Sequence, residues 1–296
     1  MKIIVFGSNG QMGSIFRKIV PNKFNVIMSD RSNLDISCKS ELESFIILNK
    51  PDFIFNFAAY TKVDDSEKNQ DLALEINANV PLVMAQSANK IGAVFLHIST
   101  DYVYDSRSEK YLDEKTKIEP CNFYGKSKAL GEKFIQESCN KYLIFRTSWL
   151  YSDIKNNFFL TISHLIRTRK KINIINDQYG APTLVYDLVS SLIKILEILT
   201  KNINNNKDNK LYWGIYNLSN SGETSWYNFA CKIASDMGYN SRDIILPINS
   251  KDYNSLAKRP SNSRLDNSKI FRVFGIKLPH WEDSFKKFKK MYPNNS

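Results

Sequence analysis

Short runs of consecutive hydrophobic residues alternate, in the first half of the chain, with segments whose hydrophobic residues recur at helical spacing. The continuous runs predict strands buried on both faces, and the periodic segments predict helices. Strands are predicted at residues 2–6, 24–28, 53–57, 93–99 and 142–148, and helices at 11–20, 39–49, 71–90 and 123–137. We expect Pro81 to bend or split the helix at 71–90. Strands that alternate with helices indicate an α/β fold of the Rossmann type, a doubly wound parallel sheet covered on both faces.

The second half of the chain has a less regular pattern. Helices are predicted at residues 158–167, 183–199 and 226–237, a strand at 212–218, and further ordered segments at 270–275 and 281–291. Residues 201–210 are rich in asparagine and lysine, which predicts a surface loop. We therefore expect a Rossmann domain at residues 1–150 and, at 151–296, mainly a smaller α/β lobe that is partly interleaved with the sheet.

Composition narrows the classes of protein that this pattern allows. Hydrophobic residues make up 43% of the 296, enough for a full core, and no run approaches the roughly 18 apolar residues of a membrane span. The apolar run at the N-terminus is too short for a secretory signal, so we expect a cytoplasmic protein without membrane insertion. The net charge of +11 is spread along the chain without a nucleic-acid-binding motif, so no nucleic-acid partner is expected. Four irregularly spaced cysteines and three scattered histidines predict neither a disulfide framework nor a metal site.

A glycine-rich loop follows the first predicted strand and opens the first predicted helix. Gly7, Gly10 and Gly13 have the spacing GxxGxxG, which differs from the GxGxxG dinucleotide fingerprint, although the strand before and the helix after match that motif. Glycine permits a sharp turn and a close approach to a pyrophosphate, which the amides of a helix N-terminus hold. The loop therefore predicts a dinucleotide site, with a purely structural turn as the alternative.

Residues after the second and third predicted strands bear on which cofactor binds. Asp30 can bind the adenosine ribose hydroxyls and favour NADH, whereas Arg31 can neutralise a 2′-phosphate and favour NADPH, so both cofactors stay open. Asp35 can contact the adenine edge or cap a helix. Ala58 and Ala59 are small enough for a cofactor to lie against the backbone, with close sheet packing as the alternative.

A tyrosine and a lysine four residues apart indicate the chemistry. Tyr124 and Lys128 share one face of the helix predicted at 123–137. A neighbouring ammonium lowers the pKa of a tyrosine, which can then act as a general acid toward a carbonyl oxygen. Thr100, at the end of the fourth predicted strand, can bring a hydroxyl to the same carbonyl, because ligands of parallel sheets bind at this edge. The alternatives are an amphipathic helix with one exposed lysine and a threonine that caps the next turn.

These motifs together resemble the extended short-chain dehydrogenase/reductase superfamily and, within it, the dTDP-4-dehydrorhamnose reductase family. The resemblance covers nearly the whole chain. It rests on the segments FGSNGQMG, STDYVY, YGKSKALGE, IFRTSWLY, INDQYGAPT and KRPSNSRLD. It implies that residues 1–150 bind NADPH or NADH and that 151–296 mainly bind a dTDP-linked 4-ketosugar.

The resemblance also implies roles for individual residues. Tyr124 is the implied proton donor and Lys128 its partner on the nicotinamide ribose, while Thr100, Asp101 and Trp149 are implied substrate contacts. The cofactor contacts that it implies are Gly10, Gln11 and Met12 for the pyrophosphate, Asp30, Asp35 and Ile36 for adenosine, and Ala59, Tyr60 and Ile98 for nicotinamide. Arg259 is expected to clamp the nucleotide diphosphate, because guanidinium binds phosphate in a bidentate manner; a surface arginine is the alternative.

Some members of this family form dimers through a magnesium ion held by glutamates near the first helix and the C-terminus. Ile15 stands where the first-helix acid is expected, so we expect no metal, and a metal-free homodimer stays open. The function that the resemblance implies is reduction of the 4-keto group of dTDP-4-dehydro-β-L-rhamnose to dTDP-L-rhamnose. The alternatives are a reductase or epimerase of another nucleotide sugar, and a non-catalytic Rossmann subunit like the regulatory subunit of methionine adenosyltransferase.

Overall fold

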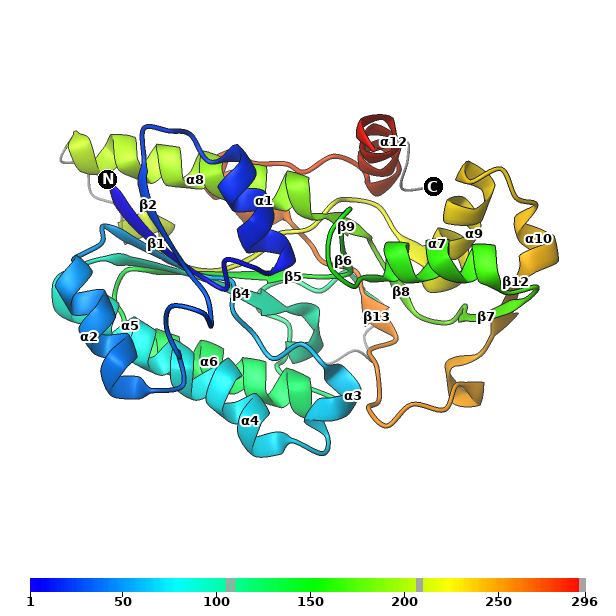
Figure 1. The fold of residues 1–296 in the computed structure, drawn as a ribbon, viewed down its shortest axis with the longest axis horizontal. Helices are drawn as coiled ribbons and strands as arrows, with labels where there is room; N and C mark the ends of the chain where they lie inside the picture. Colours follow the sequence, from blue (N-terminus) through cyan, green and yellow to red (C-terminus); the bar gives the residue numbers. More distant parts are fainter. Residues whose placement is uncertain (105–106, 108–109, 206–209, 293–296) are drawn as a thin grey trace.

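The computed structural model describes residues 1–104, 107, 110–205 and 210–292, and its centre is a six-stranded sheet (Figure 1). All neighbouring strands pair in parallel, in the order β10-β5-β4-β3-β1-β2. Their bounds are β1 Lys2–Phe6, β2 Asn25–Ser29, β3 Phe53–Asn56, β4 Val94–Thr100, β5 Tyr142–Thr147 and β10 Gly214–Asn217. The order reverses between β1 and β3, which is where doubly wound sheets bind ligands. The predicted Rossmann sheet is confirmed.

Helices cover both faces of this sheet (Figure 1). On one face lie α2 (Lys39–Asn49), α5 (Val80–Ile91) and α6 (Phe123–Ser138); on the other, α1 (Gln11–Ile19) packs against α8 (Val185–Asn204). The two layers explain why the strands are continuously hydrophobic, since successive side chains of a strand point to opposite faces.

The first strand shows this double burial. Ile3 and Val5 join the core beneath α1 and α8, while Ile4 and Phe6 join the core beneath α2 and α5. All four side chains are completely buried. A parallel sheet of this kind therefore needs the hydrophobic runs that the sequence contains.

The helix predicted at residues 71–90 is interrupted, as expected, but ahead of Pro81. It consists of α4 (Gln70–Leu74), a π-helical segment (Glu75–Asn79) and α5. Pro81 lies in the first turn of α5, where the backbone N–H that proline lacks would form no helical hydrogen bond. The π-helical segment carries Asn77, whose amide bonds the backbone of Tyr60 and the hydroxyl of Ser127. At Gly131 of α6, a Cβ atom would lie 2.1 Å from the Asn77 carbonyl oxygen, so this glycine lets α6 approach closely. The irregular segment thus fixes the position of α6.

The second half of the chain contributes short sheets and helices with a core of their own. The helices are α7 (Phe158–Thr168), α9 (Trp226–Asp236), α10 (Ser241–Ile244), α11 (Ser268–Phe274) and α12 (Trp281–Met291). The small sheets pair β7 (Ile172–Ile175) with β12 (Ile245–Ile248), β8 (Tyr179–Gly180) with β11 (Thr224–Ser225) and β13 (Asn262–Ser263), and β6 (Leu150–Tyr151) with β9 (Thr183–Leu184). The core is aromatic, with rings of Tyr151, Phe159, Phe229, Phe285 and Phe288 packed mostly at steep angles.

Two elements from this half complete the Rossmann unit. The strand predicted at 212–218 is β10, which pairs with β5 at the edge of the central sheet, and α8 packs on the face that α1 covers. The loop predicted at 201–210 is wrong for its first four residues, because α8 continues to Asn204; residues 206–209 lie outside the described part of the chain. The boundary at residue 150 stays a prediction.

Several elements were not predicted because they are too short to show a hydrophobic period. They include α3 (Val63–Ser66), α10 and the two-residue strands, together with 3₁₀ turns at Asp101–Val103, Lys210–Tyr212 and Ser250–Asp252. Among the described residues, none of the helices has the length and apolar character needed to cross a bilayer.

Candidate active site

A cavity of about 500 Å³ lies at the carboxyl ends of β3, β4 and β5. Its walls come from the glycine loop, the three strand ends and α6: Gly10, Gln11, Met12, Phe57, Ala59, Ile98, Ser99, Thr100, Asp101, Tyr124, Lys128, Thr147 and Trp149 are among its lining residues. This is the edge at which open α/β sheets bind ligands. The cavity therefore unites residues that the sequence analysis selected from five separate segments.

Tyr124 and Lys128 reach the cavity from consecutive turns of α6. The helix starts after Asn122, whose side-chain oxygen accepts the Gly125 N–H at 2.8 Å and so caps the first turn. Spacing by four residues places both side chains on one face, and both line the cavity. Tyr124 is 9% exposed and Lys128 only 1%, which excludes the alternative of an exposed lysine on an amphipathic helix.

The Nζ atom of Lys128 is held by β4. Its Nζ lies 2.7 Å from the carbonyl oxygen of Ile98 and 2.9 Å from Nε2 of His97. Burial lowers the pKa of Lys128 to about 8, an effect that the charge of Glu132 opposes. The lysine thus loses its proton far more readily than an exposed one.

Tyr124 does not have the lowered pKa that the sequence analysis expected. Burial raises the pKa of its phenol above the ordinary value, the hydrogen bond with Thr100 lowers it, and the charge of Asp101 raises it further. The expected lowering by Lys128 is wrong for the protein without cofactor, because desolvation dominates at this depth. A phenol with a raised pKa stays protonated at neutral pH, as a proton donor must.

Thr100 caps the turn after β4 and also lines the cavity, so its expected contact with a substrate carbonyl stays a prediction. Its hydroxyl lines the cavity, donates to the Asp101 carboxylate at 3.1 Å and accepts the Tyr102 N–H at 3.2 Å, so it also caps the turn after β4. The Asp101 carboxylate accepts a further short hydrogen bond from the hydroxyl of Ser263. Burial raises the pKa of Asp101 to about 6 against these hydrogen bonds.

The glycine loop packs directly on the end of β3. Gly7 has φ +76°, and a Cβ there would lie 2.6 Å from the Ala58 nitrogen. A Cβ on Gly13 would lie 2.5 Å from the Gly7 carbonyl oxygen, which shows that the first turn of α1 sits against the loop. Gly10 precedes α1 and leaves the helix N-terminus open toward the cavity. The cradle has room for an anion at the amides of α1 and none for larger side chains.

A second cavity, of about 400 Å³, continues from the first one at Gly10, Phe57 and Ala59. Its remaining lining residues are Gly7, Asn9, Ser29, Asp30, Arg31, Ser32, Leu34, Ile36, Ala58 and Ile76. Its position between β1, β2 and the glycine loop suits an adenosine. Asp35 and Tyr60 line neither cavity: Asp35 is exposed and bonds Ser37 at 3.0 Å and 2.7 Å, and the Tyr60 hydroxyl bonds Asp65.

Asp30 lies at the mouth of this second cavity with its carboxylate already engaged. One oxygen accepts from Ser8 at 3.2 Å and Asn9 at 2.7 Å, and the other accepts the Ser32 backbone N–H at 2.7 Å. The hydrogen bonds from Ser32 are the main reason that the pKa of Asp30 is lowered. Asp30 therefore ties the glycine loop to the end of β2, and Arg31 beside it is exposed.

Trp149 projects into the first cavity from the strained segment after β5. Its φ of +50° is rare for a bulky residue, and its indole stacks on Trp226 with 3.6 Å between ring centroids. Gly180 makes room for this indole, since a Cβ there would lie 2.8 Å from it. The backbone strain is sustained by this packing, and it presents an aromatic surface to the cavity.

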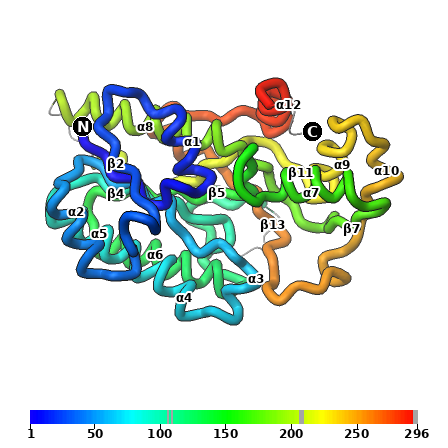
Figure 2. Tube along the Cα trace, in the orientation of Figure 1, coloured from blue at the N-terminus to red at the C-terminus, as the bar shows by residue number. Residues whose placement is uncertain are grey.

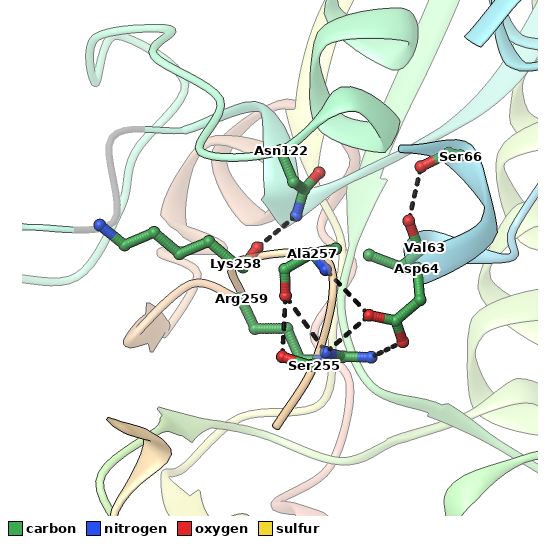
Figure 3. A network of polar contacts seen from close by, with 8 residues as sticks. All are labelled: Val63, Asp64, Ser66, Asn122, Ser255, Ala257, Lys258 and Arg259. Carbon is green, nitrogen blue, oxygen red and sulfur yellow. Dashed lines mark hydrogen bonds and ion pairs between the residues drawn. The ribbon is translucent and has the colours of Figure 1, made fainter. Parts of the chain in front are cut away.

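Arg259 lies outside the first cavity and pairs with Asp64 of α3 (Figure 3). The Asp64 carboxylate also accepts the Ala257 N–H at 3.0 Å, and the Lys258 carbonyl oxygen accepts from Asn122 at 2.8 Å. Figure 2 shows the cyan α3 beside the orange segment that leads to β13. These bonds join the loop of Arg259 to both α3 and the cap of α6, so the arginine is not an isolated surface residue.

A third cavity, of about 690 Å³, borders Arg259. Arg107, Lys251, Lys258 and Arg259 bring four basic side chains to it, and Glu119, Gln178 and Tyr253 are also among its lining residues. The chemistry of this surface suits an anionic nucleotide.

Four features of the site were not found from the sequence. Trp226 contacts Trp149 across 77 positions of the sequence, and Asp64 contacts Arg259 across 195. No local sequence pattern indicates such distant pairs. The Gln11 amide oxygen accepts from Ser152 at 2.7 Å, which ties the glycine loop to the second half. His97 is one of three scattered histidines, and its place in the hydrophobic run at residues 93–99 is the signal that could have indicated a buried polar group. Ile15 is completely buried in the core.

Comparison with known proteins identifies the family. A family model described as the RmlD substrate binding domain matches residues 1–293. The dTDP-4-dehydrorhamnose reductase of Aggregatibacter actinomycetemcomitans is 35% identical over 291 residues, 96% of this chain and 97% of that protein. A crystal structure of the Bacillus anthracis enzyme in complex with NADP has a TM-score of 0.89 at 34% identity, covering 98% and 99% of the two chains.

A dTDP-4-dehydrorhamnose reductase from Clostridium acetobutylicum is equally similar in structure. Its TM-score is 0.89 at 33% identity, covering 99% of this chain and 100% of that one. The agreement extends over both halves of the chain. The chain belongs to the dTDP-4-dehydrorhamnose reductase family.

Proposed function

We propose that this protein reduces the 4-keto group of dTDP-4-dehydro-β-L-rhamnose to dTDP-L-rhamnose with NADPH or NADH, a step in the supply of nucleotide sugars for cell-surface polysaccharides. The observation that carries the proposal is that Thr100, Tyr124 and Lys128 line one buried cavity beside the glycine loop. Family membership supplies the substrate, and the Bacillus anthracis relative was crystallised with NADP.

The residues present fit a dinucleotide. The amides of the α1 N-terminus border the first cavity and are available for the pyrophosphate, and the second cavity has room for adenosine. Gly10, Gln11 and Met12 would hold the phosphates, Ala59 and Ile98 the nicotinamide side, and Lys128 the ribose. When bound, the nicotinamide supplies the hydride for C4 of the sugar.

The chain's own residues supply the proton and the alignment. Tyr124, protonated at neutral pH, donates to O4 as charge develops there. The Thr100 hydroxyl would turn its single proton from the Asp101 carboxylate to the same oxygen. Acid catalysis of this kind contributes about 10²–10⁴-fold to the rate, and correct orientation of the reacting atoms contributes much of the rest. Trp149 would cover the sugar, and the burial of the site would keep water away.

The nucleotide end of the substrate fits the basic cavity around Arg259. Four basic side chains there match the two phosphates of dTDP. On this proposal, residues 1–150 bind the cofactor and residues 151–296 mainly bind the substrate. We further propose a cytoplasmic protein that acts on small molecules and not on nucleic acid, and that any homodimer forms without a metal, since Ile15 offers no ligand.

The test is cofactor oxidation with a panel of ketosugars. We expect turnover of NADPH or NADH with the dTDP-linked 4-keto-rhamnose precursor and much weaker turnover with UDP- and GDP-linked ketosugars. Preference for another nucleotide would indicate a reductase or epimerase of a different sugar. Cofactor binding without turnover of any ketosugar would indicate a non-catalytic Rossmann subunit and overturn the proposal.

A further inference from the structure

A chain of buried hydrogen bonds runs behind the cavity from the end of β3 to α6. The Ala58 N–H donates to Oδ1 of Asn56 at 3.0 Å, and Nδ2 of Asn56 lies 3.1 Å from Nδ1 of His97. On the far side of the ring, Nε2 of His97 lies 2.9 Å from Lys128 Nζ, which donates to the Ile98 carbonyl oxygen at 2.7 Å. Asn56 and His97 are completely buried.

The direction of this chain follows from its first member. The Ala58 backbone can only donate, so the Asn56 atom facing it is the oxygen, and the atom facing His97 is the amide nitrogen. Because that nitrogen can only donate, Nδ1 of His97 must accept. A neutral imidazole has one N–H, so the proton of His97 lies on Nε2 and points at Lys128.

This assignment of the proton assumes that His97 is neutral, and the surroundings of the ring disfavour its cationic form. Complete burial is the largest influence on His97 and holds its pKa well below the ordinary value, so the ring is neutral even beside an uncharged Lys128. A protonated Lys128 is also a poor partner, since an ammonium has no lone pair to accept from Nε2–H. If His97 moved its proton to Nδ1 instead, two donors would face each other between His97 and Asn56, a costly arrangement for buried groups.

We propose that Asn56 and His97 are positioning residues that hold Lys128 as a free amine in the cofactor-free protein, and that cofactor binding protonates Lys128 and releases it from His97. The inference rests on the proposed function in assigning the nicotinamide ribose as the new partner of Lys128. The step is a simple proton uptake from solvent: the amine lone pair takes the proton, and no electrons are exchanged with the cofactor. The ammonium then repels the Nε2–H of His97 and turns toward oxygens in the cavity.

The charges around Lys128 are compatible with such a switch. Glu132 on α6 favours the ammonium, but its carboxylate is paired with Arg146 of β5. Asp101, in the turn after β4, raises the pKa of Tyr124, whereas burial and Glu132 are the influences on the pKa of Lys128. Burial lowers the pKa of Lys128 to about 8, so part of the population is already a free amine near physiological pH. The direction of the hydrogen-bond chain favours the free amine further. The negative phosphates of a cofactor would favour the ammonium.

The tautomer of His97 tests the proposal directly. The chain has three histidines, of which His164 and His280 are exposed, so the non-titrating imidazole in a ¹⁵N–¹H NMR spectrum of the cofactor-free protein belongs to His97. We expect its proton on Nε2. A proton on Nδ1 would mean that Lys128 donates to the ring as an ammonium, and the proposal would be overturned.

A second measurement links the tautomer to cofactor binding. Calorimetry of NADPH binding in two buffers of different ionisation enthalpy should show uptake of about one proton per cofactor at about pH 8.5. Asn56→Asp replaces the donor with a carboxylate that accepts from Nδ1, so it should shift the proton of His97 to Nδ1 and reduce the proton uptake to near zero. Ser87→Ala, which removes a buried α5 hydroxyl without a hydrogen-bond partner among the described residues, is the control and should change neither.

These readouts separate the inference from the proposed function. Suppose that no ketosugar is reduced, but NADPH binds with proton uptake and His97 carries its proton on Nε2. The proposed activity is then overturned, and the proposed protonation of Lys128 is supported. If turnover is found but the wild-type protein takes up no proton on binding NADPH at about pH 8.5, the proposed protonation of Lys128 is overturned and the proposed activity stands. Should Asn56→Asp not fold, the wild-type tautomer and proton uptake still decide the question.

Discussion

At the carboxyl end of β4 the titratable side chains are buried, whereas at the end of β2 Asp30 is half-buried and Arg31 is exposed. Tyr124, Lys128 and Asp101 have at most 9% of their surface exposed, and burial is the largest influence on the pKa of each. Asp30 at the other end is solvent-accessible, and the pKa shift of its carboxylate comes first from hydrogen bonds with Ser32. One continuous site thus has two regions with different physical control.

The difference shows how the two regions can perform different tasks. Desolvation, charges and hydrogen bonds all shift pKa values, and in the buried region desolvation is the largest of the three, so the groups that could transfer protons there depart from their pKa values in water. Recognition of an adenosine needs only shape and hydrogen bonds, which exposed side chains supply. Substitutions in the buried region should therefore have large and pH-dependent effects, and those in the exposed region small ones.

The largest effect is expected from Tyr124→Phe. Removal of the phenol should lower kcat by about 10²–10⁴-fold and leave the Kd for cofactor nearly unchanged, because the ring remains and only the proton donor is lost. Steady-state kinetics and cofactor fluorescence titration measure the two quantities. Tyr102→Phe removes a phenol whose ring lies 5.5 Å from that of Tyr124, and it should lose far less. Near wild-type turnover of Tyr124→Phe would show that another group is the acid.

The residues behind this prediction were accessible from the sequence because their placement follows local rules. Spacing by four in a helix and position at a strand end brought Tyr124, Lys128 and Thr100 to one cavity. The direction of the Tyr124 pKa was predicted wrongly, because burial depends on packing that the motif does not encode. The fold could be predicted to a similar extent. Hydrophobic periodicity located the long helices and strands, whereas the two-residue strands and the π-helical turn around Asn77 depend on tertiary contacts.

Glu132→Gln should show that burial controls stability in the same region. The Glu132 carboxylate forms a two-pronged ion pair with Arg146, at 2.9 Å and 2.5 Å, and both side chains are nearly inaccessible. Removal of one charge leaves the guanidinium buried and unpaired, so we expect a loss of about 3–5 kcal/mol in the free energy of unfolding. Urea denaturation followed by circular dichroism measures this.

An exposed pair provides the matched control for Glu132→Gln. Glu43 and Lys90 form an ion pair between α2 and α5, with 40% and 60% of their side chains exposed. Glu43→Gln should therefore cost less than about 1 kcal/mol. Equal losses for the two variants would contradict the expectation that burial decides the cost of breaking an ion pair.

Asp101→Asn should stabilise the protein in a pH-dependent manner. Burial raises the pKa of Asp101 to about 6, so the folded protein binds a proton that the unfolded chain releases between the ordinary carboxyl pKa and pH 6. Stability from this group is therefore greatest at acid pH and decreases as the pH rises through that range. The variant lacks this penalty and should exceed the wild type by about 1–3 kcal/mol at neutral pH, with the difference vanishing near pH 4. Thermal unfolding across pH measures it, and a pH-independent difference would contradict the assignment.

The smallest effect is expected at the exposed end, from Arg31→Ala. Asp30 has its carboxylate oxygens engaged by Ser8, Asn9 and Ser32, so it is a weak competitor for ribose hydroxyls, whereas the guanidinium of Arg31 is exposed at the cavity. Removal of an exposed ion pair with the 2′-phosphate should raise KM for NADPH about two- to fivefold and leave KM for NADH unchanged. The effect on NADPH should become smaller as salt is added. Arg272→Ala, an exposed arginine on α11, serves as the control for net charge. Equal changes for both cofactors would mean that Arg31 acts through Asp30 or the loop and not through the 2′-phosphate.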